Sequence, residues 1–192
     1  MATTLQKLKF SEIIYEHFTY WTPITLGTLF MRSGFAPLRV SIGFGGQFLS
    51  IDARPSDRST AAQELPTAPE LAQNTDCCSR FGAQYVSQVL EWQKSVSDIG
   101  RRGRVAVAWS AGARGVTFLN LAMAKRRVLA GIVDVNPRKW GKYVPGCGLP
   151  VIAPDELPSL RPDIVLLANE IYEREVREML MSYGLDPEIC II

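Results

Sequence analysis

The sequence predicts an α/β protein built on a Rossmann-like parallel sheet, and three observations lead to that prediction. First, apolar runs alternate with helix-like stretches in the second half of the chain, as in parallel strands joined by crossover helices. Second, a turn of small residues, 110–115, separates the first of these runs from a helical stretch. Third, the following apolar run ends on an acid, Asp134. Strand, glycine turn, helix, strand and acid is the order of a nucleotide-binding βαβ unit.

The first 53 residues predict a smaller α/β arrangement. Ile13–Tyr20 is rich in β-branched and aromatic residues, which predicts a strand or the exit from one. Thr22-Pro23 combines a capping hydroxyl with a first-turn proline, so a helix is expected to begin there and to stop at Gly34. A hairpin is expected from two further strands, Leu38–Ile42 and Phe48–Ala53.

A change of composition then marks a linker and a long helix. Arg54–Pro69 contains prolines and small polar residues without an apolar period, which is typical of a linker. Glu70–Ile99 is expected to be helical and to end near Gly100 and Gly103. Its buried face is expected to contain Leu71, Phe81, Tyr85, Val89, Trp92 and Val96.

The second half of the chain alternates between the two kinds of element. Strands are expected at residues 105–109, 128–133, 151–152, 164–168 and 188–192. Helical segments are expected at residues 116–124, 154–160 and 171–183. The carboxyl ends of such parallel strands are where open α/β sheets bind ligands.

The glycine turn fits the fingerprint G-x-G-x-x-G incompletely, because Ser110 stands at its first position. Backbone N–H groups of such a turn can approach a phosphate, and the helix N-terminus adds a favourable dipole. A side chain at Gly112 would block that approach, and would be strained if the turn needs a positive φ there. Asp134 follows about 20 residues later, where an acid can accept a hydrogen bond from a ribose hydroxyl. A turn that only lets helix and strand pack closely explains the glycines equally well.

Composition narrows the classes of function. A chain of 192 residues with 47% hydrophobic and 21% charged residues can bury one core, or one core and a small appendage. A net charge of +2 gives no reason to expect a nucleic acid or an acidic membrane as partner. No membrane span or secretory leader is evident, so we expect a cytoplasmic protein. The four cysteines form no C-x-x-C pair, so no metal site is expected.

Several motifs resemble the C-terminal part of sugar C-methyltransferases that use S-adenosylmethionine. Tyr15-Glu-His-Phe-Thr-Tyr20 and Gly46-Gln-Phe48 are similar to the tail of the family's methyl-transfer domain. Four more segments are similar to its Rossmann-like C-terminal domain: Ala111–Gly115, Asp134-Val-Asn-Pro-Arg138, Gly141-Lys-Tyr-Val-Pro-Gly146 and Asn169-Glu-Ile-Tyr172. The resemblance implies a Rossmann-like domain preceded by a small α/β remnant of a methyltransferase domain. The expected boundaries are 1–53 for the methyltransferase tail, 54–69 for the linker and 70–192 for the Rossmann-like domain.

The resemblance also implies catalytic residues. The family's active site contains a Tyr-x-Glu-His arrangement, which Glu16 and His17 match, whereas Ile14 stands at the tyrosine position and Tyr15 is displaced by one residue. His17 would remove a proton from the carbon to be methylated, because imidazole titrates near neutral pH. Glu16 would orient His17 or contact a sugar hydroxyl. A lone histidine at a strand end, satisfied by the backbone, is the alternative.

Basic residues near the glycine turn suit a diphosphate, such as that of a nucleotide-sugar. A solvated rim of basic side chains is the alternative explanation for Arg114 and Lys139. The expected substrate-binding residues are Gly112, Arg114, Gly115, Asp134, Lys139, Tyr143 and Asn169.

The implied function is the C-terminal portion of an S-adenosylmethionine-dependent C-methyltransferase acting on a nucleotide-sugar or similar small molecule. Family members begin with a zinc-binding domain and a G-x-G-x-G loop for S-adenosylmethionine, and neither occurs in these 192 residues. The expected partners are therefore the small-molecule substrate and a missing N-terminal half. A truncated product and an inactive relative also fit the sequence. The alternatives are a stand-alone nucleotide-binding module without catalysis and an NAD-dependent oxidoreductase.

Overall fold

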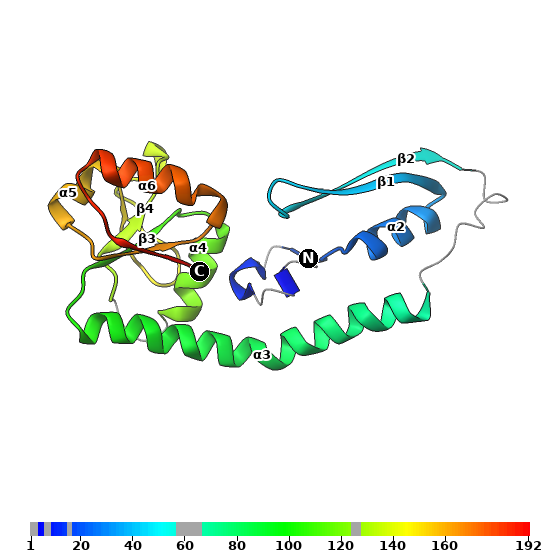
Figure 1. Cartoon of the computed structure of the whole chain (residues 1–192), viewed down its shortest axis with the longest axis horizontal. Coiled ribbons are helices and arrows are strands. Elements are labelled where there is room, and N and C mark those ends of the chain that lie inside the picture. Colours follow the sequence, from blue (N-terminus) through cyan, green and yellow to red (C-terminus); the bar gives the residue numbers. More distant parts are fainter. Residues whose placement is uncertain (1–3, 6–8, 15–16, 57–66, 124–127) are drawn as a thin grey trace. The chain divides into compact units, whose positions relative to one another are not determined.

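The computed structural model describes residues 4–5, 9–14, 17–56, 67–123 and 128–192. The chain forms two compact units (Figure 1). The N-terminal unit lies within residues 1–8 and 15–85, and the Rossmann-like unit within residues 9–14 and 86–192. The border between the two units falls inside one long helix, α3 (Ala68–Arg101).

The N-terminal unit contains the predicted helix and hairpin. Helix α2 (Pro23–Arg32) begins where expected, because Thr22 Oγ1 accepts a hydrogen bond from the Thr25 N–H at 3.2 Å. The helix is followed by Gly34, whose φ of +85° lies in the left-handed region. Strands β1 (Phe35–Gly43) and β2 (Phe48–Pro55) pair antiparallel, so the hairpin is confirmed.

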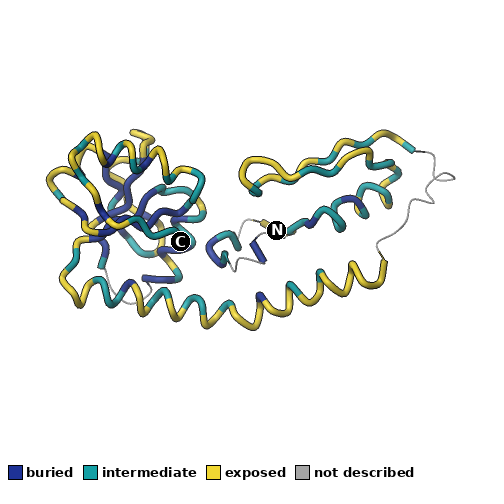
Figure 2. The backbone as a smooth tube through the Cα atoms, in the orientation of Figure 1, coloured by how far each residue is buried: buried dark blue, intermediate teal, exposed yellow. Residues whose placement is uncertain are grey.

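The hairpin keeps apolar surface that α2 covers only in part. One face carries the paired side chains Val40, Ile42, Leu49 and Ile51. The ring of Phe30 on α2 lies 5.8 Å from that of Phe35 on β1. Leu38 and Ile42 nevertheless remain 64% and 55% exposed, and Figure 2 shows the hairpin in the colours of intermediate and exposed residues.

Helix α3 confirms the long helix expected over residues 70–99. Its predicted buried face is correct at Phe81 and Val96, which are 9% and 2% exposed. The prediction is wrong at Leu71, which is 47% exposed. A helical period shows which side of a helix is apolar, but it does not show which turns of a long helix are covered.

The Rossmann-like unit is built on a five-stranded parallel sheet in the order β5-β4-β3-β6-β7, which confirms the predicted fold class. From β3 the chain runs outward through β4 and β5, then crosses back to β6 and β7. The order therefore reverses between β3 and β6, and crevices at such points bind ligands in open α/β sheets. The strands are β3 (Ala106–Trp109), β4 (Gly131–Val133), β5 (Val151–Ile152), β6 (Ile164–Leu167) and β7 (Glu188–Ile191).

Helices bury both faces of this sheet (Figure 1). On one face, Val107 and Val165 belong to a core cluster that also holds Leu157 of α5 (Leu157–Leu160) and Val176 of α6 (Glu173–Ser182). The opposite face is covered by α4 (Ala113–Ala122) and by the second half of α3. The fully buried Phe118 of α4 packs its ring against Trp92 of α3 at a centroid distance of 5.1 Å.

A short segment near the N-terminus belongs to the Rossmann-like unit. The 3-10 helix η1 (Phe10–Glu12) packs against α4. Phe10 is 3% exposed, and its ring lies 5.9 Å from that of Phe118. A buried aromatic side chain thus anchors residues 9–14 to the unit formed by the second half of the chain.

Three sequence predictions need correction or lie outside the described residues. The strand expected at Ile13–Tyr20 is wrong, because none of its described residues joins a β-ladder. β-branched residues form a strand only where a neighbouring edge pairs with them. Helix α4 begins at Ala113, three residues earlier than predicted, because Gly112 is its N-cap. Most of the predicted linker, residues 57–66, lies outside the described residues.

Candidate functional site at the carboxyl edge of the sheet

The glycine turn joins β3 to α4 at the carboxyl edge of the sheet. Gly112 has φ −90° and ψ 179°, an extended conformation that any residue can adopt. The left-handed residue is Ser110, with φ +82°, at the position of the fingerprint's first glycine. A side chain is disfavoured in that conformation, which is the physical reason for glycine there. A positive φ is therefore not what Gly112 provides.

Gly115 provides close packing between helix and strand. A Cβ atom at this position would lie 2.2 Å from the backbone oxygen of Ser110, so no side chain fits. At Gly112 the nearest atom to such a Cβ would be Ser110 Oγ at 3.5 Å, which is ordinary contact. Gly115 is thus explained by packing alone, whereas packing does not require a glycine at position 112.

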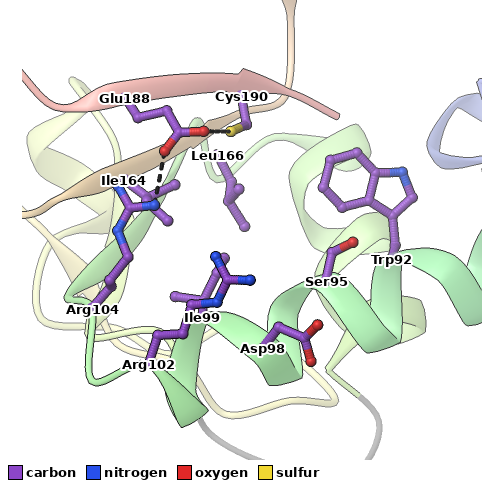
Figure 3. Close-up of a pocket in the computed structure, with 10 residues that line it drawn as sticks. All are labelled: Trp92, Ser95, Asp98, Ile99, Arg102, Arg104, Ile164, Leu166, Glu188 and Cys190. Atoms are coloured by element: carbon purple, nitrogen blue, oxygen red, sulfur yellow. Dashed lines mark hydrogen bonds and ion pairs between the residues drawn. The ribbon is translucent and has the colours of Figure 1, made fainter.

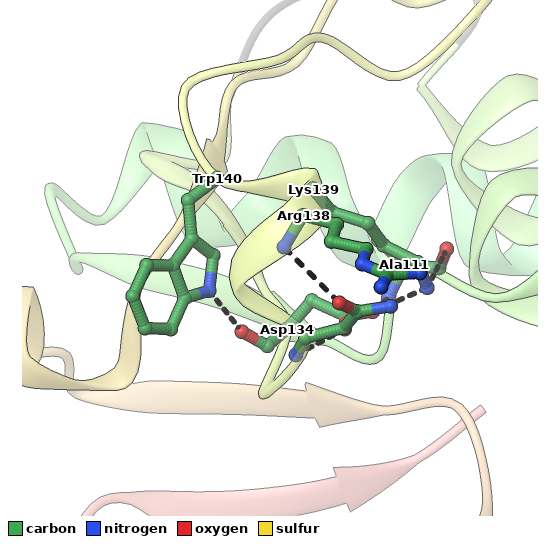
Figure 4. A network of polar contacts seen from close by, with 6 residues as sticks. Ala111, Asp134, Arg138, Lys139 and Trp140 are labelled. Carbon is green, nitrogen blue, oxygen red and sulfur yellow. Dashed lines mark hydrogen bonds and ion pairs between the residues drawn. The ribbon is translucent and has the colours of Figure 1, made fainter.

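Asp134 holds the turn to the loop that follows β4 (Figure 4). Its side chain is nearly buried and accepts three hydrogen bonds from the chain itself. Oδ2 accepts from the Ala111 N–H at 2.8 Å and from Lys139 Nζ at 2.9 Å, and Oδ1 accepts from the Asn136 N–H at 2.9 Å. Lys139 Nζ also donates to the Ala111 oxygen at 3.0 Å. A ligand hydroxyl at Asp134 would have to share the carboxylate with these donors.

The remaining residues of the Asp-x-Asn-Pro-x-Lys stretch complete the same loop. Asn136 Oδ1 accepts from the Arg138 N–H at 3.1 Å and caps the 3-10 helix η3 (Pro137–Lys139). The Trp140 indole N–H donates to the Asp134 backbone oxygen at 2.6 Å. This motif therefore has a structural explanation that needs no ligand.

Arg114 forms an ion pair with Glu12, an acid that no sequence motif marks. Its guanidinium lies 3.2 Å from Glu12 Oε1, and the two side chains are only 22% and 16% exposed. Lys9 pairs with Glu170 at 2.9 Å. The segment around η1 thus contacts residues that follow β3 and residues that follow β6. No local pattern signals Glu12, because its partner lies about a hundred residues away in the sequence.

Asn169 follows β6 and acts locally as a cap. Its Oδ1 accepts from the Ile171 N–H at 3.3 Å at the start of the 3-10 helix η5 (Glu170–Tyr172). The end of β6 lies beside the end of β3, because the Ala168 N–H donates to the Trp109 oxygen at 3.3 Å. Asn169 therefore stands at the edge where the sequence predicts a ligand, and its only side-chain oxygen already accepts from the Ile171 N–H.

Tyr143 lies at the base of a loop that is anchored to α4. Its backbone forms an isolated bridge with Pro150, and its side chain is 67% exposed. Asn120 Nδ2 donates to the Pro145 oxygen at 3.0 Å. Gly146 has φ +86°, and a Cβ there would lie 1.9 Å from Asn120 Oδ1, so the Tyr-Val-Pro-Gly motif needs its glycine.

The expected catalytic residues belong to the other unit. His17 is exposed, and its ring lies 5.6 Å from that of Tyr20 in an edge-to-face arrangement. Tyr15 and Glu16 lie outside the described residues. The roles proposed for these three residues therefore stay predictions.

The described part of the chain contains neither a metal-binding cluster nor a membrane-spanning helix. Its histidines, cysteines, aspartates and glutamates form no group of three or more able to hold a metal ion. Its helices include none long and apolar enough to cross a membrane.

Comparison with known proteins identifies one family. The family model of the C-methyltransferase C-terminal domain matches residues 52–184, more than half of the chain. No curated protein matches. Among solved structures, RSP, a Rex-family repressor, is similar with a TM-score of 0.37 and 14% sequence identity, covering 66% of this chain and 76% of that one. A similarity this weak supports no argument about function.

Proposed function

Because the chain belongs to the C-methyltransferase C-terminal domain family, we propose that it supplies the substrate-binding part of an S-adenosylmethionine-dependent C-methyltransferase. The proposed substrate is a nucleotide-sugar or a similar small molecule. The observation that carries the proposal is the family match over residues 52–184. Use of S-adenosylmethionine follows from the family in general, and its G-x-G-x-G loop does not occur in this sequence.

Features at the carboxyl edge of the sheet support the proposal that a diphosphate binds at the glycine turn. No side chain caps the first turn of α4, and a Cβ atom at Gly112 would make only an ordinary contact, with Ser110 Oγ at 3.5 Å. A helix N-terminus of this kind favours an anion through free N–H groups and the helix dipole. Arg114 would add a charge-assisted contact after exchanging Glu12 for a phosphate oxygen.

His17 is the proposed base in the N-terminal unit. Its exposed imidazole would accept the proton from a carbon next to a carbonyl group, leaving an enolate on the substrate. Glu16 would orient the imidazole, and Tyr15 would contact the substrate. The cofactor would supply the methyl group to the enolate carbon.

A partner for the N-terminal unit is supported by its exposed apolar side chains. A two-stranded hairpin with one helix is marginal as an isolated fold. Exposed apolar patches of this kind mark surfaces that another polypeptide covers. We propose that the segment carrying the S-adenosylmethionine loop covers the hairpin, whether as a separate chain or as part of a longer one.

Titration calorimetry tests this proposal. We expect no binding of S-adenosylmethionine to the isolated chain, and submillimolar binding of nucleoside diphosphate sugars. Arg114→Gln should weaken nucleotide-sugar binding, and Glu12→Gln should strengthen it by freeing Arg114. Arg174→Gln, which removes the same charge from an exposed position on α6, is the control. A stoichiometric complex with S-adenosylmethionine, or no response to any nucleotide-sugar, would contradict the proposal.

The same titration separates the alternative functions. Nucleotide binding without methyl transfer, even after the missing half is added, would favour a binding module. Tighter binding of NAD than of nucleotide-sugars would favour an oxidoreductase. The oxidoreductase alternative rested on the glycine turn and Asp134, and the Asp134 carboxylate is already hydrogen-bonded three times within the chain.

A further inference from the structure

A cavity of about 350 Å³ opens on the face of the Rossmann-like sheet that α3 covers (Figure 3). Ile164 and Leu166 of β6 form its apolar floor, together with Ile99 of α3. Trp92 stands at one end, and Glu188 and Cys190 of the edge strand β7 at the other. The volume is in the range of small-molecule sites, which are mostly apolar with a few polar groups.

Of the charged side chains at the rim, the exposed Arg102 is the one that forms no ion pair with another described residue. Arg104 donates to Glu188 Oε2 at 2.8 Å, so these two charges compensate each other. Asp98 is paired with Arg101 on the same helix. In the described part of the chain, no acceptor is within hydrogen-bond distance of the Arg102 guanidinium, which points into the space between α3 and the strands (Figure 3).

We infer that this cavity binds a small organic anion with a flat apolar body, such as an aromatic carboxylate. The guanidinium of Arg102 would bind the anionic group, since its planar fork matches a carboxylate. The isoleucine and leucine floor and the Trp92 ring would cover the apolar body. A cationic ligand would be repelled by Arg102. A neutral ligand would gain nothing from the Arg102 charge, because Arg102 is exposed and its guanidinium would stay hydrated.

This site is independent of the proposed methyl-transfer function. Its lining comes from α3, the loop before β3, and strands β6 and β7. The glycine turn and Asp134 are not among the lining residues. A ligand here would occupy a face of the sheet rather than its carboxyl edge.

An NMR titration with 2-naphthoate tests the site. The chain has four tryptophans, and the indole N–H signals of Trp92 and Trp140 can be assigned with Trp92→Phe and Trp140→Phe variants. We expect 2-naphthoate to shift the Trp92 signal with a submillimolar dissociation constant. The Trp140 signal reports on the carboxyl edge, because its indole bonds to the Asp134 oxygen, and it should not move.

Variants and an uncharged analogue make the test specific. Arg102→Gln should weaken 2-naphthoate binding about tenfold or more, as loss of a hydrogen bond to a charged group does. Arg174→Gln should leave the affinity for 2-naphthoate within about twofold of wild type, since exposed charges contribute little. The uncharged analogue 2-naphthamide should bind the wild-type chain at least about tenfold more weakly than 2-naphthoate, because it lacks the carboxylate charge. Three results would each overturn the inference: no shift of Trp92 at several millimolar, equal binding by Arg102→Gln and wild type, or a shift of Trp140 in place of Trp92.

Discussion

Gly112 and Gly115 lie three residues apart, but only Gly115 stands where a side chain cannot fit. Gly115 has no room for a Cβ atom, which would lie 2.2 Å from a backbone oxygen that cannot move without shifting β3. Gly112 has an ordinary conformation and ordinary space around it. The sequence identifies both as turn glycines, but only backbone geometry shows which one the packing requires.

We predict that Gly115→Ala lowers the free energy of unfolding by about 3 kcal/mol, the upper end for overpacking at a tight site. Gly112→Ala is the matched control and should change it by less than about 0.5 kcal/mol. Urea denaturation followed by circular dichroism measures both. Equal destabilisation by the two variants would show that the close approach at Gly115 is not the controlling contact.

Cys190 offers a prediction about pH. Burial raises the pKa of the Cys190 thiol, and the neighbouring Glu188 carboxylate raises it further. The thiolate is the reactive form, so a raised pKa delays reaction to higher pH. We expect alkylation of Cys190 by iodoacetamide to reach its half-maximal rate at higher pH in the native chain than in urea.

Mass spectrometry of the Cys190 peptide follows this reaction. A hydrogen bond from Arg104 lowers the pKa of Glu188, so Glu188 is ionised throughout the range in which thiols titrate. Glu188→Gln should therefore lower the midpoint part of the way toward its value in urea, leaving the contribution of burial. An unchanged midpoint in Glu188→Gln would remove the carboxylate as a cause.

Elements with a clear period were predictable from sequence, and those that depend on distant partners were not. The parallel strands and α3 follow from apolar runs and helical spacing. The strand expected at Ile13–Tyr20 is not formed: the composition suits a strand, but none of the described residues of this segment joins a β-ladder. The sequence predicts which charged residues lie near the site, such as Arg114. It does not predict their partners: that Arg114 pairs with Glu12 is evident only from the structure.

The loop after β4 is an element held together by one carboxylate. Asp134→Ala would leave the Ala111 and Asn136 N–H groups without their acceptor, and the Lys139 ammonium with only the Ala111 oxygen. We predict a loss of about 3 kcal/mol in the free energy of unfolding, as expected when a buried ionic partner is removed. Lys139→Met should cost only about 1 kcal/mol, because that side chain is partly exposed and both N–H donors to Asp134 remain.

Asp155→Ala, which removes an exposed carboxylate from the same unit, is the control for Asp134→Ala. Chemical denaturation without any ligand gives the comparison. If Asp134→Ala is as stable as Asp155→Ala, the network is not what holds the loop, and Asp134 becomes available for the ribose role expected from the sequence.

At the scale of the whole molecule, each of the two units is built from two segments that are not contiguous in the sequence. Residues 9–14 belong with residues 86–192, although the segments that flank them cluster with the N-terminal unit. Sequence patterns report contacts between neighbours along the chain, and this association joins residues about a hundred positions apart. Its anchor is one aromatic side chain, Phe10, beside the fully buried Phe118.

The role of Phe10 as an anchor can be tested by comparing it with Phe18, a second phenylalanine near the N-terminus. Phe10 is 3% exposed and packs on Phe118, whereas Phe18 is 99% exposed. Phe10→Ala should destabilise the Rossmann-like unit by about 3 kcal/mol through lost burial and the cavity left behind. Phe18→Ala should change stability by less than about 0.5 kcal/mol. Hydrogen exchange along α4, measured by mass spectrometry, should rise in Phe10→Ala alone. If both variants exchange as wild type does, residues 9–14 are not an integral part of the Rossmann-like unit, and the Glu12–Arg114 pair cannot be what a diphosphate would have to displace.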